Sequence, residues 1–339
     1  MIKIENIKYS VVKEPFFGLP KTEPELSDEV FKVRLERTLA AMRTNNLDYL
    51  VFYADREHYS NFDYIAGFGP RFEEGILVLN KTGQAHILLG NECYGMYQHS
   101  RIPAEGILCQ TLSLPNQPIE KYKDLGEVFA DIGIQNNHNV GIVGWKLIYP
   151  VFGNRYMFDT PSFIVESVRS IVGNENAINA TDLFIHPDYG VRIINSADEI
   201  ASFEFGATYA SDAAQKMLLN LRTGLNEVEI SQFGTAGSLP QSCFPKVLSG
   251  ARMNLGMVSP TTNVVKLGDR FQVNMGLRGG LTNRRGFAVY SEEDLPEESR
   301  DFMEKIAAPY FAVVANWYEK VGIGVTGGEI YNMVETTYP

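Results

Sequence analysis

The stretch Gly224-Leu-Asn-Glu-Val-Glu-Ile230 returns near the end of the chain as Gly324-Val-Thr-Gly-Gly-Glu-Ile330. Each copy follows a long helical pattern and has the features of one helix ending and another beginning. A repeat at matching offsets predicts two pseudo-symmetric halves built from the same order of elements. The alternative is a chance likeness between two ordinary helix ends.

Three β-rich segments follow the first copy, at residues 244–248, 269–277 and 285–290. Glycine and proline separate them, as is typical of strands joined by turns. No comparable segments follow the second copy, because the chain reaches Pro339 shortly after it. We therefore expect the second half of the repeat to be absent from this chain.

A long helix is expected before the first copy. Ser196 and Glu199 form a capping box at its start, and Gly224 is expected to end it. One apolar stripe runs along it: Ile200, Phe203, Ala207, Ala210, Ala214, Met217 and Leu221. The sequence His186-Pro-Asp-Tyr-Gly190 interrupts the pattern just before this helix and predicts a boundary between a domain of residues 1–190 and a domain of residues 191–339.

The first domain alternates helical and strand patterns. Residues 26–44 have apolar side chains at helical spacing, with Ser27 as a candidate cap. Short β-rich runs follow at residues 48–53, 75–79, 85–89 and 139–143. This order predicts an α/β domain with a mostly buried sheet.

Composition excludes several classes of function. The formal net charge of −11 and the pI near 5.1 argue against a nucleic-acid partner, which Lys and Arg would have to neutralise. Three widely spaced cysteines form no Cys-x-x-Cys pair, which fits a reducing, cytoplasmic setting. No apolar run is long enough to cross a membrane. The most apolar stretch, residues 306–317, is expected to be a buried helix.

The chain resembles the superfamily of aminopeptidase P, prolidase and creatinase. In the first domain the resemblance lies in Leu47-Asp-Tyr-Leu-Val-Phe-Tyr53, Asp63-Tyr-Ile-Ala-Gly-Phe68 and Gly90-Asn-Glu92. In the second it lies in Arg192-Ile-Ile-Asn-Ser-Ala-Asp-Glu-Ile200, Ser249-Gly250 and Leu267-Gly-Asp269 through Asn274-Met-Gly276. It implies a creatinase-type N-terminal α/β domain followed by part of a pita-bread α+β domain.

The peptidases of this superfamily hold two divalent metals, Mn, Co or Zn, with two Asp, one His and two Glu. The resemblance places the first Asp at Asn274 and the second at Arg285. No Asp or Glu occurs between Phe271 and Tyr290, so no shift of register restores a ligand. The remaining His and Glu ligands would lie beyond Pro339. We therefore predict no metal cofactor for this chain, because two-metal hydrolysis needs carboxylates to bridge the ions.

The substrate-contacting His of the superfamily falls on Met257. Creatinase, which hydrolyses a C–N bond without metal, similarly has Asn at the position of Asn274 and a Pro-x-Thr-like stretch near Pro260. However, its general-base His also corresponds to Met257, and a thioether has no proton to exchange.

Three readings of function stay open. The first is a peptidase-like hydrolase without metal-dependent activity, or with metal-free C–N hydrolysis. The second is a non-catalytic module for a peptide or small carboxylate, with Arg278, Arg284 and Arg285 receiving the acid. These arginines could instead be solvated or pair with acids at residues 292–294. The third is a fragment of a longer protein.

The resemblance also implies a homodimer. In creatinase relatives the loop equivalent to Arg71-Phe-Glu-Glu74 extends toward the site of the partner subunit. Arg71 is therefore a further candidate ligand-binding residue, although a solvated turn explains the same residues equally well.

Overall fold

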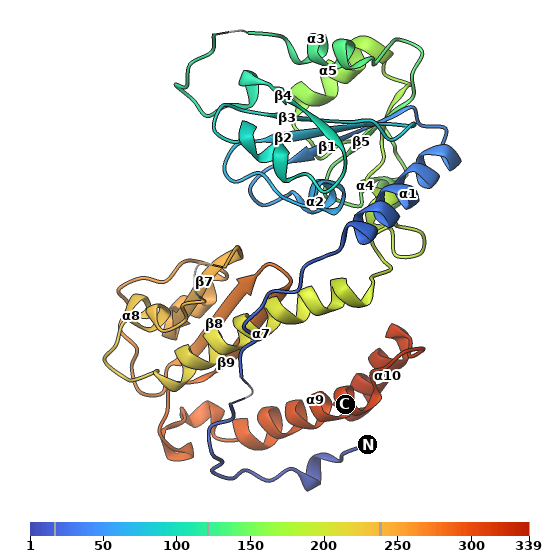
Figure 1. Ribbon diagram of the computed structural model, residues 1–339. Helices are drawn as coiled ribbons and strands as arrows, with labels where there is room; N and C mark the ends of the chain where they lie inside the picture. The colour runs from blue at the N-terminus through green and yellow to red at the C-terminus, as the bar shows by residue number, and fades with distance from the viewer. Residues whose placement is uncertain (17, 121, 237–238, 339) are drawn as a thin grey trace. The chain divides into compact units, whose positions relative to one another are not determined.

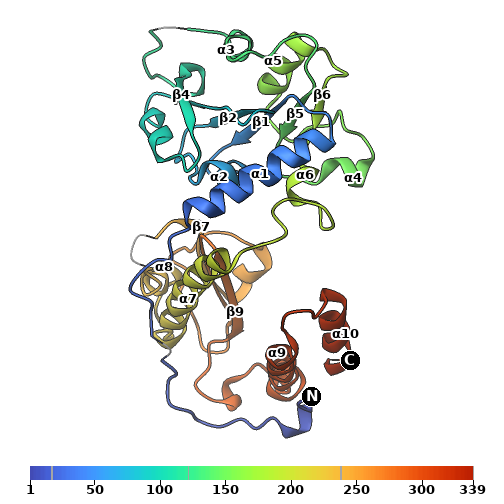
Figure 2. The same cartoon turned by 45° about the vertical axis from the view of Figure 1, so that its right-hand side comes forward.

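The computed structural model describes residues 1–16, 18–120, 122–236 and 239–338. The chain forms two compact units. The N-terminal unit is Pro24–Ser202, and the C-terminal unit is Phe203–Pro339 together with Met1–Glu23. Figure 1 and Figure 2 show the elements of each unit in two views.

The N-terminal unit contains a six-stranded mixed sheet in the order β4-β3-β2-β1-β5-β6. Strands β1, β5 and β6 run parallel, β2 runs antiparallel to β1 and β3, and β4 is parallel to β3. Their bounds are Tyr49–Ala54 for β1, Gly75–Asn80 for β2, Ala85–Leu89 for β3, Ala104–Leu108 for β4, Val140–Val143 for β5 and Ala177–Asn179 for β6.

Helices cover both faces of this sheet (Figure 1). On one face, α1 (Asp28–Thr44) and α2 (Ser60–Ala66) pack on Leu50, Phe52 and Leu77. On the other face, α3 (Leu125–Ile132) and α5 (Ser162–Val172) pack on Val51 and Val78. The α/β class and the expected strands are confirmed, because a sheet buried on both faces produces the continuous apolar runs seen in the sequence.

The C-terminal unit contains a three-stranded antiparallel sheet in the order β7-β8-β9. Its strands are β7 (Gln241–Ser249), β8 (Arg270–Leu277) and β9 (Gly280–Phe287). One face packs on helix α7 (Ala197–Leu219), where Val273 and Met275 meet Ala210, Ala214 and Met217. Figure 2 shows α7 against this sheet.

The expected third strand of this sheet, residues 285–290, was placed too late in the chain. Strand β9 begins at Gly280, which pairs with Leu277, so the turn consists of Arg278 and Gly279 alone. Gly279 has a φ of +86°, which a glycine adopts without strain. The segment between the two expected strands, residues 278–284, therefore contains the tight hairpin turn and the first part of β9.

The expected long helix is present, with two differences. The capping box is formed, because the Ser196 and Glu199 backbone amides each donate to the other side chain. The helix ends at Leu219 rather than at Gly224. Ile200 and Phe203 are 57% and 46% exposed, so the apolar stripe is buried only where the sheet covers it, from Ala210 to Met217.

The two compact units divide after Ser202, inside α7. The domain boundary near residue 190 stays a prediction. The first turn of α7 is attached to the N-terminal unit because Glu199 accepts two hydrogen bonds from Arg34 of α1, at 2.6 and 3.0 Å. The segment Met1–Glu23 joins the C-terminal unit, where Tyr209 donates to the Pro20 carbonyl at 2.9 Å.

The repeated sequence has the same local structure in both copies. Gly224 and Gly324 both adopt left-handed φ values, +92° and +89°. Helices α8 (Glu227–Gln232) and α10 (Gly327–Thr337) follow them, and each begins with a capping box that ends on Glu229 or Glu329. The two copies therefore share a turn and a capped helix, which a repeat and a chance likeness of two helix ends both predict.

The apolar segment 306–317 forms the end of the π-helix η7 (Met303–Ala307) and most of α9 (Ala308–Lys320), but it is not a buried helix. Tyr310 and Phe311 are 61% and 60% exposed. The buried side includes Asn316, whose amide group bonds both backbone groups of Ile2, at 2.6 and 2.9 Å. No helix in the described part of the chain is long and apolar enough to cross a membrane.

The remaining helices are short. Two are α-helices, α4 (Ile148–Phe152) and α6 (Asp182–Ile185). The others are 3-10 turns: η1 (Ile4–Asn6), η2 (Tyr94–His99), η3 (Gln110–Leu112), η4 (Gly250–Leu255), η5 (Glu292–Asp294) and η6 (Glu297–Ser299).

Candidate functional site

Asn274 and Arg285, which the sequence resemblance predicts at metal-ligand positions, lie on the β7-β8-β9 sheet, on the face opposite α7. Asn274 pairs with Asn283, and Gln272 pairs with Arg285. Paired residues of antiparallel strands point to the same face, so Asn274, Gln272 and Arg285 share one face, which we call the site face. Asn274 is 1% exposed, whereas Arg285 is exposed. Arg285 is a diagonal neighbour of Asn274, about 7–8 Å away in such a ladder.

Met257 is held next to this face. It follows η4 and is 50% exposed, and its sulfur accepts a hydrogen bond from Gln272 Nε2 at 3.7 Å. Gln272 is two residues from Asn274 along β8 and is 3% exposed. The structure thus brings Met257 and Asn274 together through one buried amide side chain.

Lys246 is the functional candidate that sequence reasoning missed. It lies on β7 directly opposite Asn274, so it also belongs to the site face. It is 6% exposed, and its ammonium nitrogen lies 4.2 Å from the centre of the Phe244 ring. A single lysine followed at once by the apolar run Val247-Leu248 was the available signal.

Lys246 forms no salt bridge with an acidic side chain in the described part of the chain, and its ammonium nitrogen lies over the Phe244 ring. The site face therefore carries a positive charge that a bound anion could pair with.

The arginines proposed as ligand-binding residues do not gather at one place. Arg278 is part of the β8–β9 turn. Arg284 pairs with Val273, so it points to the α7 face of the sheet, away from Asn274. Arg71 belongs to the N-terminal unit, in the exposed loop after α2. Of the four arginines, Arg285 shares the site face.

The acids at residues 292–294 were an alternative partner for these arginines. Asp294 instead accepts hydrogen bonds from the backbone amides of Tyr290 and Ser291, both at 3.0 Å. Its carboxylate therefore caps the turn that follows β9.

A buried carboxylate organises the loop that carries Met257. Glu227 of α8 is fully buried and accepts hydrogen bonds from the backbone amides of Ser249, at 2.9 Å, and Thr261, at 3.0 Å. Arg252 Nε donates to the same carboxylate at 3.0 Å, and Asn263 at 3.3 Å. Both ends of the 249–263 loop are thus attached to one side chain. In the second copy of the repeat the equivalent position is a glycine.

The donor set of the site face does not fit a pair of divalent ions. It offers three neutral amides, those of Gln272, Asn274 and Asn283, and two cations, Lys246 and Arg285. The Cys243 thiol also reaches this face, where it donates to Asn274 Oδ1 at 3.4 Å. At an effective dielectric of about 20, unit charges about 4 Å apart interact by about 4 kcal/mol, and the repulsion of a divalent ion is about twice that. No group of three or more His, Cys, Asp or Glu side chains that could hold a metal occurs among the described residues.

Solved structures of several peptidases resemble the chain, whereas no family model and no curated protein matches it. The prolidase from Pyrococcus horikoshii OT3 superposes with a TM-score of 0.64 at 17% identity, over 90% of this chain and 77% of that one. This chain has the prolidase fold. The Xaa-Pro dipeptidase from Bacillus anthracis gives a TM-score of 0.60 at 15% identity, over 91% of this chain and 77% of that one.

The X-Pro aminopeptidase from Thermotoga maritima MSB8 gives a TM-score of 0.59 at 15% identity, over 89% of this chain and 76% of that one. The resemblance deduced from the sequence is thereby confirmed for the fold. The prolidase fold explains why the weak motifs stand in the right order along the chain. At these identities it says nothing of activity, so the site must be judged by its own residues.

Proposed function

We propose that this prolidase-fold chain is a binding module for a carboxylate-bearing ligand, such as a small acid or a peptide C-terminus, and does not perform metal-dependent peptide hydrolysis. The observation that carries the proposal is Lys246, a residue that is 6% exposed and lies on the site face opposite Asn274. A ligand carboxylate would pair with its positive charge. Arg285, exposed on the same face, would contribute a second, bidentate contact.

The chemistry of the face supports binding rather than catalysis. Hydrolysis needs a nucleophile and a group that transfers a proton. Met257 supplies neither, and the amides of Asn274 and Gln272 do not titrate. The Cys243 thiol bonds to Asn274 at 3.4 Å, but the C-terminal unit contains no histidine that would activate it. The creatinase-like alternative requires a general base at the position of Met257, so no residue of the site face favours it.

The Lys246→Met variant tests the proposal. Met keeps the apolar stem but removes the charge, so the loss of a hydrogen bond between charged groups is expected to weaken carboxylate binding about 10-fold or more. Calorimetric titration of the full chain with the dipeptide Ala-Pro measures this change. The amidated dipeptide lacks the carboxylate. Its affinity for the native chain is expected to be no higher than the affinity of the free dipeptide for the variant.

Lys266→Met is the matched control, because Lys266 is an exposed lysine of the same unit. It removes the same net charge and is expected to leave the affinity within about 2-fold of native, since exposed charges contribute little. Equal binding of the free and amidated dipeptides by the folded native chain, or no binding of either, would refute the proposal.

A further inference from the structure

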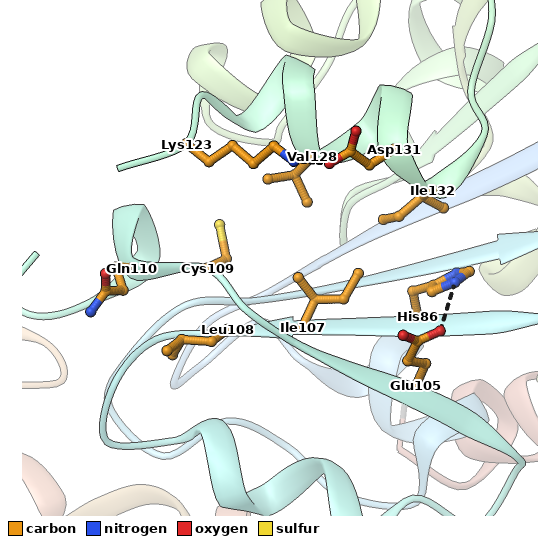
Figure 3. Close-up of a pocket in the computed structure, with 10 residues that line it drawn as sticks. All are labelled: His86, Glu105, Ile107, Leu108, Cys109, Gln110, Lys123, Val128, Asp131 and Ile132. Atoms are coloured by element: carbon orange, nitrogen blue, oxygen red, sulfur yellow. Dashed lines mark ion pairs between the residues drawn. The ribbon is translucent and has the colours of Figure 1, made fainter. Parts of the chain in front are cut away.

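A slot in the N-terminal unit lies between α3 and the edge of the sheet formed by β3 and β4 (Figure 3). Its volume is about 380 Å³. Small-molecule sites have volumes of about 300–1,000 Å³, so this slot has room for a small ligand. It belongs to a different unit from the site face, and its argument is independent of the function proposed above.

The floor of the slot comes from the sheet. Glu105, Ile107 and Cys109 alternate along β4 and its end, so their side chains share one face. His86 of β3 pairs with Glu105 in the parallel ladder, which places these two side chains next to each other. Helix α3 forms the opposite wall with Val128 and Ile132. The slot therefore combines an apolar middle with one polar end.

His86 and Glu105 form the polar end of the slot. His86 is 6% exposed, and Figure 3 shows its ring at the slot beside Glu105. In the described part of the chain its one polar partner is the Glu105 carboxylate, with 3.5 Å between His86 Nε2 and Glu105 Oε2. That separation exceeds the usual hydrogen-bond range of about 2.7–3.2 Å. The contact is therefore a long ion pair, and the Glu105 carboxylate keeps the capacity to accept a hydrogen bond from a ligand.

The charges of the slot favour a cation. Lys123 forms an ion pair with Asp131, so these two charges balance each other at the α3 wall. The Glu105 side chain is 71% exposed, and His86 is its ion-pair partner among the described residues. An ammonium group placed beside them would donate a hydrogen bond to the carboxylate.

Cys109 also lines the slot but does not suggest covalent chemistry. Burial raises the pKa of the Cys109 thiol, so it stays protonated at neutral pH. Its sulfur lies 3.4 Å from Thr111 Oγ1. The thiol acts as part of the apolar floor, and the slot is suited to reversible binding.

We propose that this slot binds a small amine with an apolar body. The ammonium group contacts His86 and Glu105, and the body lies between Ile107 of the sheet and Val128 and Ile132 of α3. No group in the slot is positioned to react with the amine, so the slot acts as a binding site alone.

An NMR titration of the full, ¹⁵N-labelled chain with 2-phenylethylamine tests this proposal. A ligand of about nine non-hydrogen atoms at about 0.5 kcal/mol per atom gives a Kd on the order of 1 mM. We expect saturable shifts of the backbone amides of His86, Glu105 and Ile107. The anion 3-phenylpropionate, which carries a carboxylate in place of the ammonium group, is expected to bind at least about 10-fold more weakly.

Glu105→Gln removes the charge of a mostly exposed side chain, so the fold is retained, and we expect it to weaken binding of the amine about 5-fold or more. Glu175→Gln removes the same charge from an exposed site outside the slot and is expected to change nothing. Shifts that do not saturate, equal affinity for the amine and the anion, or full affinity in Glu105→Gln would each overturn the proposal.

Discussion

Replacing Glu227 by Ala is expected to lower the free energy of unfolding of the C-terminal unit by about 3–5 kcal/mol. The carboxylate is fully buried and accepts hydrogen bonds from Ser249, Arg252, Thr261 and Asn263. Its removal leaves two backbone amides and one guanidinium without their acceptor. The chain has two tryptophans, one in each unit, so urea unfolding followed by Trp317 fluorescence in a Trp145→Phe background reports on this unit alone.

Glu229→Ala is the matched control, two residues further along the same helix. Glu229 is exposed and completes the capping box with Asn226, so its loss is expected to cost about 1 kcal/mol. The two variants remove the same charge and differ in the burial of the carboxylate. Equal effects of the two substitutions would contradict the role assigned to Glu227 in holding the 249–263 loop.

Replacing Arg34 by Met is expected to destabilise the N-terminal unit by a similar amount, about 3–5 kcal/mol. Arg34 and Glu199 are 9% and 6% exposed, and the variant leaves the buried carboxylate unpaired. The guanidinium also lies over the rings of Phe31 and Tyr64, at 4.8 and 4.6 Å from their centres. Urea unfolding followed by Trp145 fluorescence in a Trp317→Phe background measures the loss.

The pH dependence of this loss gives an independent check. Burial alone would raise the pKa of Glu199, but hydrogen bonds from the Ser196 backbone and from Arg34 outweigh it and hold the pKa below its ordinary value of 4.5. A lowered pKa contributes stability above about pH 4.5 that is lost as the pH falls through the folded-state value. In Arg34→Met the Glu199 carboxylate has no partner, so its protonation relieves the cost of burying an unpaired charge. The difference in unfolding free energy between the native chain and the variant is therefore expected to shrink in acid.

The control for Arg34 is Lys32→Met on the same helix. Lys32 pairs with Glu29 at 3.5 Å, and both side chains are more than 60% exposed, at 63% and 69%. Such pairs contribute about 0–1 kcal/mol, so we expect little change at any pH. If the difference in unfolding free energy between the native chain and Arg34→Met stayed constant down to strongly acidic pH, protonation of Glu199 could not account for the pH dependence.

The N-terminal sheet was predictable from the sequence because its central strands are buried on both faces. Such strands appear as continuous apolar runs, and residues 75–79 and 85–89 match β2 and β3 almost residue for residue. Helix α1 was found for a related reason, since its apolar side chains recur at helical spacing. Local patterns suffice where burial is uniform along the element.

The site face was harder to predict because it depends on pairing between strands. Asn274 and Arg285 were found through a resemblance at fixed spacing, but Lys246 joins them only through the register of β7 on β8. Strand β9 was misplaced because the turn of Arg278 and Gly279 resembled a longer loop. The exposure of one side of α9 was missed for a similar reason. A run of apolar residues does not indicate which face of the helix another element covers.

The metal content of the purified chain after dialysis against Mn²⁺ tests the central claim most directly. The claim is that the site face, which carries Lys246 and Arg285, does not bind divalent ions. Because these cations repel a divalent ion, the account predicts no stoichiometric manganese in the native chain. One or two Mn²⁺ per chain, lost in the Asn274→Ala variant, would contradict it.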